Sequence, residues 1–211
     1  MSLIIFGLLS VCGADPFYTY DIKNPGIGVV ELSKDTTIYA KPDESSPKLI
    51  MLEISPKISN MTMMGENNSD SYFLARVPAK NLAYLVATDD NEKGWIEVCW
   101  SQKENLTGWI KTGSENMWSW SDFYDKWGIK NGVYFFKDVP PEDKKLYAQP
   151  FENPEDKKPV ENFSYAYKVR PVVLKGNWML VRVLDINNVE KIGYLRWRED
   201  DGKLLLFPLL K

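Results

Sequence analysis

The sequence contains no histidine and only two cysteines among its 211 residues. Without histidine, the usual general base of a Ser-His-Asp or Cys-His site and the commonest metal ligand are both missing. Cys12 and Cys99 give no disulfide framework, and Cys99 lies in an alternating run that favours a small buried side chain over a reactive thiol. No pair of carboxylates stands out for glycosidase chemistry. We therefore expect no enzyme activity, no cofactor and no metal.

Concentrated positive charge is lacking as well. The chain has 26 Lys and Arg against 29 Asp and Glu, a formal net charge of −3, and no segment gathers the basic residues. Because nucleic-acid binding depends on a strong local positive potential, nucleic acid is not an expected partner. The phosphate-binding patterns GxGxxG and GxxxxGK[ST] are absent too, so no nucleotide loop is indicated.

The apolar run at residues 3–11 is too short to span about 30 Å of hydrocarbon as a helix. Its length suits the core of a secretory leader, and Ala14 provides a small residue at a cleavage site. Residues 1–14 therefore predict export to the periplasm or the extracellular medium. Basic residues do not precede the run, which departs from the usual leader.

Two other interpretations of this segment stay open. Residues 9–12 (LSVC) resemble a lipobox, the motif that marks a bacterial lipoprotein, although Val11 stands where small residues are usual. Acylation at Cys12 would give peripheral, lipid-anchored membrane association. Alternatively, the apolar run is a strand or helix of the fold itself.

Aromatic residues are abundant, with eight Trp, eleven Tyr and nine Phe. From residue 29 onward, short alternating segments follow one another, separated by clusters of Asp, Asn, Gly, Ser and Pro. Short strands joined by polar turns are typical of an all-β barrel or sandwich and unlike a parallel α/β sheet.

One short helix is predicted within residues 118–132 (WSWSDFYDKWGIKNG). Ser119 is placed to cap its N-terminus with Asp122 three residues on, and Gly128 or Gly132 can end it. Aromatic residues recur at the spacing of one helical face, at Trp120, Phe123, Tyr124 and Trp127. Such a face is expected to pack against a neighbouring sheet.

Three short patterns occur twice in the same order. They are 38–42 (IYAKP) with 146–150 (LYAQP), 93–98 (KGWIEV) with 176–181 (GNWMLV), and 107–111 (TGWIK) with 192–196 (IGYLR). Glycine before the aromatic residue permits a tight turn into the strand. The first copy carries extra residues between its first two patterns, and this insertion should include residues 55–70.

These patterns resemble the bacterial SH3-like domain family, in which an aliphatic-x-x-x-Pro strand precedes a GWxxV hairpin and a closing GW[IV] strand. The resemblance covers most of residues 30–113 and 133–208. The usual Asn-Val-Arg opening is replaced by TTIYAKP and KKLYAQP, so ligand contacts that the family makes through that arginine are not carried over.

The resemblance implies an all-β protein made of two tandem small SH3-like β-barrels joined by a short aromatic-rich helix. Barrel 1 is predicted at residues 29–113, the helical linker at 114–132 and barrel 2 at 133–211. A buried sheet core would lie inside each barrel, with alternate residues of every strand facing outward.

The favoured function is a non-catalytic envelope module that recognises cell-wall peptide, glycan or a similar polymer through aromatic-lined grooves. The alternative is a structural or assembly protein of the bacterial envelope that pairs with another envelope protein or with itself. For the ring residues, packing that closes the barrel competes with a ligand role. The candidate ligand-binding residues are Tyr39, Trp95, Trp100, Trp118, Trp120, Tyr147 and Trp178.

Overall fold

The computed structural model describes residues 17–18, 24–54, 72–91, 93–136, 139–150, 159–162, 168–185 and 187–210. The predicted leader at residues 1–14, with Cys12, and the predicted insertion at residues 55–70 lie outside these ranges. Most elements are β-strands, which confirms the all-β prediction. Within the same ranges, no helix is both long enough and apolar enough to cross a membrane.

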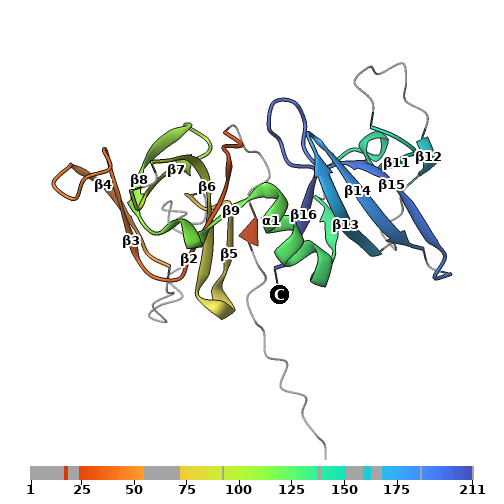
Figure 1. Ribbon diagram of the computed structural model, residues 1–211, viewed down its shortest axis with the longest axis horizontal. Helices are drawn as coiled ribbons and strands as arrows, with labels where there is room; N and C mark the ends of the chain where they lie inside the picture. The colour runs from red at the N-terminus through yellow and green to blue at the C-terminus, as the bar shows by residue number, and fades with distance from the viewer. Residues whose placement is uncertain are drawn as a thin grey trace, which may run out of the picture.

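The strands form two antiparallel sheets, one on each side of the helix α1 (Trp120–Tyr124) (Figure 1). The first sheet contains β1 (Phe17–Tyr18), β2 (Gly28–Leu32), β3 (Thr36–Tyr39), β4 (Lys48–Leu52), β5 (Ala75–Val77), β6 (Leu82–Asp90), β7 (Trp95–Ser101), β8 (Leu106–Lys111) and β9 (Met117–Ser119). The second contains β10 (Val133–Phe135), β11 (Lys145–Tyr147), β12 (Pro159–Asn162), β13 (Lys168–Lys175), β14 (Trp178–Leu184), β15 (Glu190–Arg196) and β16 (Leu206–Pro208). Short helical turns are η2 (Pro78–Lys80), η3 (Ser114–Asn116), the π-helical η4 (Asp125–Ile129) and η5 (Pro141–Asp143).

The two sheets share one strand order. The first runs β4-β3-β8-β7-β6-β2-β9, and the second runs β12-β11-β15-β14-β13-β10-β16. Strands β1 and β5 are additional in the first sheet, where β5 also pairs with β6. The sequence repeat therefore corresponds to a repeat of topology.

Irregularities of pairing are repeated as well. The register of β6 against β7 shifts between Ala87 and Asp89, and that of β13 against β14 shifts between Pro171 and Val173. A bulge changes the direction of the side chains that follow it. Because the bulge is repeated, equivalent positions of the two sheets face outward after it.

Two equivalent glycines allow strands to approach closely. A Cβ atom on Gly108 in β8 would lie 2.5 Å from Ile38 Cγ2 of β3, and one on Gly193 in β15 would lie 2.7 Å from Leu146 Cγ of β11. Carbon atoms do not approach this closely without displacement. The lack of a side chain at these two glycines therefore permits β3 to pack closely on β8, and β11 on β15.

The helix between the sheets begins as the sequence predicts. Ser119 Oγ accepts a hydrogen bond from the Asp122 backbone N–H at 3.1 Å, which confirms the N-cap. The helical path continues through η4, and Gly132 follows with φ of +91°. The predicted linker is not helical throughout, because it also contains strand β9, which pairs with β2.

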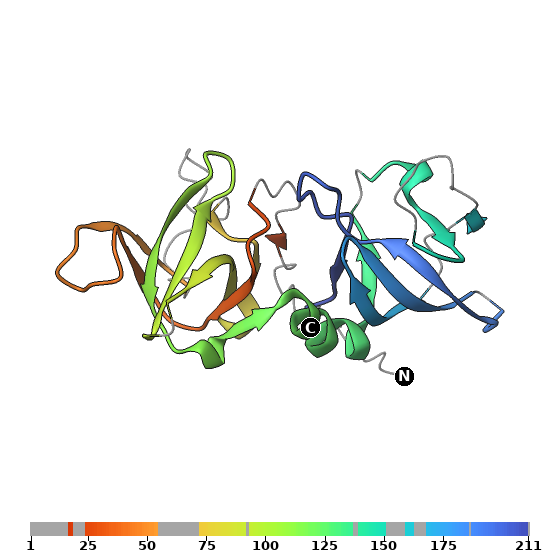
Figure 2. The same cartoon turned by 45° about the horizontal axis from the view of Figure 1, so that its top comes forward.

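This helix is part of the hydrophobic core. One buried cluster lies within the first sheet, whereas a second cluster extends from the first sheet through α1 into the second sheet. Phe123 and Tyr124 have no exposed surface, and Tyr124 Oη donates a hydrogen bond to the Leu206 carbonyl at 2.5 Å. Figure 2 shows α1 seated between the two sheets, close to the C-terminal end of the chain. The two halves are thus packed on a shared helix.

Candidate functional site

A pair of aromatic rings recurs at the same place in each half. The Tyr39 and Trp95 ring centroids are 5.5 Å apart with an interplanar angle of 87°. The Tyr147 and Trp178 centroids are 5.6 Å apart at the same angle of 87°. We call these the first and second ring pairs. Four of the seven predicted ligand-binding residues are therefore brought together two by two.

The local backbone explains the repetition. A glycine with positive φ, +78° at Gly94 and +57° at Gly176, makes a turn into β7 and into β14. The left-handed conformation suits glycine, which has no Cβ to clash. The following strands begin at Trp95 and Trp178, close to the tyrosine that ends β3 or β11.

A third aromatic residue accompanies each pair. Trp109 of β8 is the cross-strand partner of Tyr39, and Tyr194 of β15 is the partner of Tyr147. Directly opposed residues of an antiparallel pair have neighbouring side chains on one face. Both residues follow a glycine in the repeated patterns 107–111 and 192–196, and this position is the sequence signal that marks them, although neither is one of the seven candidate residues.

Neither ring pair belongs to the buried clusters found among the described residues. In each pair one ring is well covered, Trp95 at 8% exposed and Tyr147 at 4%. The other ring, Tyr39 or Trp178, is half-buried. Burial, together with the nearby Asp143 carboxylate, raises the pKa of Tyr147 above its usual value. Each pair thus has one anchored ring and one that retains contact with solvent.

The surroundings of the two pairs differ in chemistry. At four outward positions, the first sheet carries Thr88, Asp89, Glu97 and Thr107, and the second sheet carries Val172, Val173, Leu180 and Ile192. The pairings establish the equivalence, since Glu97 lies opposite Trp109 just as Leu180 lies opposite Tyr194. The first pair therefore borders polar and acidic groups, whereas the second borders aliphatic ones.

The Glu97 carboxylate is held in place. It accepts hydrogen bonds from Thr88 Oγ1 at 2.6 Å and from Thr107 Oγ1 at 3.1 Å. Trp95 and Glu97 share one face of β7 because they are two residues apart in the strand. The threonine partners come from neighbouring strands, and sequence spacing alone does not place them.

The other predicted residues lie elsewhere. Trp100 packs against the core of the first sheet, 5.9 Å from the Tyr72 ring centroid, and its indole donates to the Thr107 carbonyl. Lys126 Nζ lies 3.9 Å from the ring centroid of Trp118.

Trp120 joins the two halves. It is 7% exposed, its indole donates to the Pro25 carbonyl at 2.8 Å, and its ring centroid is 5.5 Å from that of Trp197. These contacts leave little ring surface for a ligand. Trp100, Trp118 and Trp120 are therefore not brought together with either ring pair.

The arrangement is suited to binding. Cys99 is the free cysteine of the described residues, and burial raises the pKa of its thiol to about 11, so the reactive thiolate is scarce at neutral pH. Among the described side chains, no group of three or more Cys, Asp or Glu is placed to hold a metal ion. What the ring pairs offer is aromatic surface beside hydrogen-bonding or aliphatic groups.

No protein-family model and no curated protein matches this chain. The resemblance to the SH3-like family thus stays a prediction. The function has to be inferred from the geometry of the described residues.

Proposed function

We propose that this is a non-catalytic binding protein of the bacterial envelope that holds cell-wall peptide, glycan or a similar polymer at its two ring pairs. The observation that carries the proposal is the duplication of one ring geometry, 5.5 Å and 87° in the first half against 5.6 Å and 87° in the second. The rings persist in both halves although the four flanking positions differ in chemistry.

The half-buried ring of each pair is suited to contact with a ligand. An aromatic face packs on the apolar side of a sugar ring or on a peptide side chain, and nearby polar groups then fix the orientation. Glu97, oriented by Thr88 and Thr107, is such a polar group beside the first pair. A T-shaped pair also adds about 0.5–1.5 kcal/mol of local stability, which keeps the exposed ring in one position.

Two sites on one chain favour a polymeric ligand. When both sites engage one molecule, the second contact is intramolecular, and the overall affinity exceeds that of either site by about 10²–10⁴-fold. We infer that each half is an SH3-like barrel, which the repeated strand order and repeated bulge support. The envelope location is part of the proposal and depends on residues 1–14.

Removing the more accessible ring of each pair tests the function. We expect Tyr39→Ala and Trp178→Ala each to reduce sedimentation of the protein with purified cell wall, because each variant loses avidity. The double variant should show no retention at low salt. Circular dichroism of each variant establishes that it is folded.

Trp100→Ala is the matched control, since it removes a half-buried tryptophan of β7 that packs on the inner side of the strand. Its retention should equal that of the unmodified protein. Equal retention of the double variant, or no retention of the unmodified protein on wall material, would refute the proposed function.

A further inference from the structure

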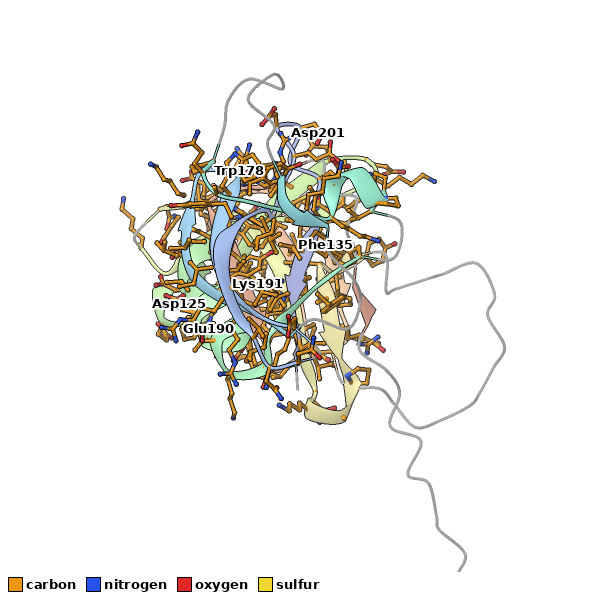
Figure 3. The ribbon with its side chains drawn as sticks, turned by 90° about the vertical axis from the view of Figure 1, so that its right-hand side faces the viewer. Asp125, Phe135, Trp178, Glu190, Lys191 and Asp201 are labelled. Atoms are coloured by element: carbon orange, nitrogen blue, oxygen red, sulfur yellow. The ribbon has the colours of Figure 1, made fainter. Side chains whose placement is uncertain are left out.

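The outward face of β13, β14 and β15 combines aliphatic and basic side chains. The three strands lie side by side in the second sheet (Figure 1). Burial alternates along β14 and β15, and along β13 as far as Pro171; at the bulge, the consecutive Val172 and Val173 are both exposed. In Figure 3, Trp178 and Glu190 lie at opposite ends of this face. We call it the β13–β15 face; its outward residues are Lys168, Arg170, Val172, Val173, Lys175, Trp178, Leu180, Arg182, Leu184, Glu190, Ile192, Tyr194 and Arg196.

The centre of the β13–β15 face is aliphatic and open to solvent. Val172 is 44% exposed, Val173 is 46% exposed and Ile192 is 59% exposed. At the equivalent positions the first sheet carries threonine or aspartate. The fold therefore does not require exposed apolar side chains at these positions. Covering such side chains gains about 25 cal/mol for each Å² removed from water. Exposed aliphatic side chains gathered on one face of a sheet commonly mark an interaction site.

Basic side chains surround this aliphatic centre. Strands β13 to β15 and their connections contain six basic residues and two acidic ones, Asp185 and Glu190, in a chain whose net charge is −3. Among the described residues, no carboxylate lies within ion-pair distance of Lys168, Arg170 or Lys175.

Arg170 and Arg182 lie directly opposite each other. They are cross-strand partners in the β13–β14 pairing, and both are exposed. Like charges in such a position cost about 0.2–1 kcal/mol. Glu190 lies 3.8 Å from Arg182 in a pair that is itself largely exposed, so it compensates little. In the first sheet the equivalent residues are the buried Val86 and Cys99. Two opposed guanidinium groups would be stabilised by a carboxylate placed between them.

We propose that the β13–β15 face docks an extended segment of a partner protein that carries carboxylates and aliphatic side chains alternately on one side. A carboxylate would bind between Arg170 and Arg182, and an aliphatic side chain would pack on the neighbouring row of Val173 and Leu180. Successive rows of a sheet are two residues apart, which is also the spacing of side chains on one side of an extended segment. This inference does not depend on the ring pairs binding a polymer.

The chemistry of the face favours a protein segment over other anions. A simple polyanion would use the basic rim and gain nothing from the exposed aliphatic centre. An anionic bilayer would meet the Glu190 carboxylate at one end of the face, at a cost in repulsion. A peptide can place carboxylates opposite the arginines and aliphatic side chains opposite the aliphatic centre. Protein interfaces commonly have such an apolar centre within a polar rim.

The test uses four synthetic probes and the unmodified protein. A labelled peptide with the repeat Glu-Ser-Val-Ser is compared with Lys-Ser-Val-Ser, with Glu-Ser-Ser-Ser and with phosphatidylglycerol vesicles. We expect the Glu-Ser-Val-Ser peptide to bind best by fluorescence anisotropy. Its affinity should fall by about tenfold when the ionic strength is raised from a low value until the Debye length is about 8 Å.

Charge and aliphatic contact are tested separately by substitution. Arg170→Glu combined with Arg182→Glu should weaken binding of the Glu-Ser-Val-Ser peptide by about tenfold or more. Val173→Ser should weaken it several-fold without changing its salt dependence. Lys34→Glu combined with Lys41→Glu makes the same change in net charge on the first half, and it should leave binding unchanged.

Several outcomes would overturn the inference. They are equal binding of Glu-Ser-Ser-Ser, binding to vesicles alone, full binding by the arginine double variant, or self-association of the protein that Val173→Ser abolishes. Retention on cell wall is measured with the same variants. Because the arginine double variant keeps both ring pairs, unchanged wall retention with lost peptide binding separates this inference from the proposed function.

Discussion

Replacing Phe123 with alanine is expected to lower the free energy of unfolding by about 3–5 kcal/mol, the usual range for a buried phenylalanine. Its ring has no exposed surface and lies 5.5 Å from the Tyr84 ring and 5.7 Å from the Phe207 ring, centroid to centroid. Tyr84 belongs to the first sheet and Phe207 to the second. The substitution would therefore leave a cavity where the two halves meet, and we expect it to reduce the cooperativity of unfolding as well as the stability.

Chemical denaturation followed by circular dichroism and tryptophan fluorescence measures both effects. Phe73→Ala is the matched control, because Phe73 is 1% exposed but belongs to the cluster confined to the first sheet. It should be comparably destabilising without separating the halves. Unfolding of Phe123→Ala that is as cooperative as that of Phe73→Ala would show that α1 does not couple the two sheets. A loss below about 1 kcal/mol would show that the Phe123 ring is not buried between them.

Alanine at Gly193 should cost about 1–3 kcal/mol or more, because the added methyl group overpacks a strand crossing. Its Cβ would lie 2.7 Å from Leu146 Cγ and 2.8 Å from the Tyr147 carbonyl oxygen. Since a backbone atom cannot rotate away, β11 would have to move, and Tyr147 with it. We therefore expect both lower stability and weaker retention on cell wall.

Gly108→Ala should behave in the same way in the first half, where the Cβ would lie 3.0 Å from the Tyr39 carbonyl oxygen. Gly176→Ala is the control, since no atom lies within 4 Å of its Cβ position and only the positive φ opposes the substitution. That conformation costs roughly 1–2 kcal/mol for a residue with a Cβ. If thermal unfolding shows Gly193→Ala to be no more destabilising than Gly176→Ala, the crossing is not as tight as described.

Local signals in the sequence predicted much of the fold. The Ser119 cap, the aromatic face of the helix and the strands that begin at Trp95 and Trp178 follow from periodicity and turn chemistry. The repeated patterns anticipated that Tyr39 and Tyr147 would occupy equivalent places. The role of the helix was not evident, because periodicity shows that a face is apolar without showing how many partners bury it.

Features that depend on neighbouring strands could not be predicted. Arg170 and Arg182 lie on the two strands of one hairpin, but they are directly opposite each other only because the bulge between Pro171 and Val173 shifts the register. The same holds for the threonines on Glu97. For Trp120, burial depends on the second sheet closing over it, and a single sequence does not specify that packing.

The indole N–H resonances show directly whether the ring pairs contact the ligand. We expect soluble cell-wall fragments added to nitrogen-15-labelled protein to shift the indole signals of Trp95 and Trp178, assigned by substitution, in a saturable manner. The Trp120 signal, from a ring buried between the halves, should stay unchanged. Saturable shifts confined to tryptophans outside the ring pairs, or no shift at any tryptophan, would show that the ring pairs do not bind the ligand.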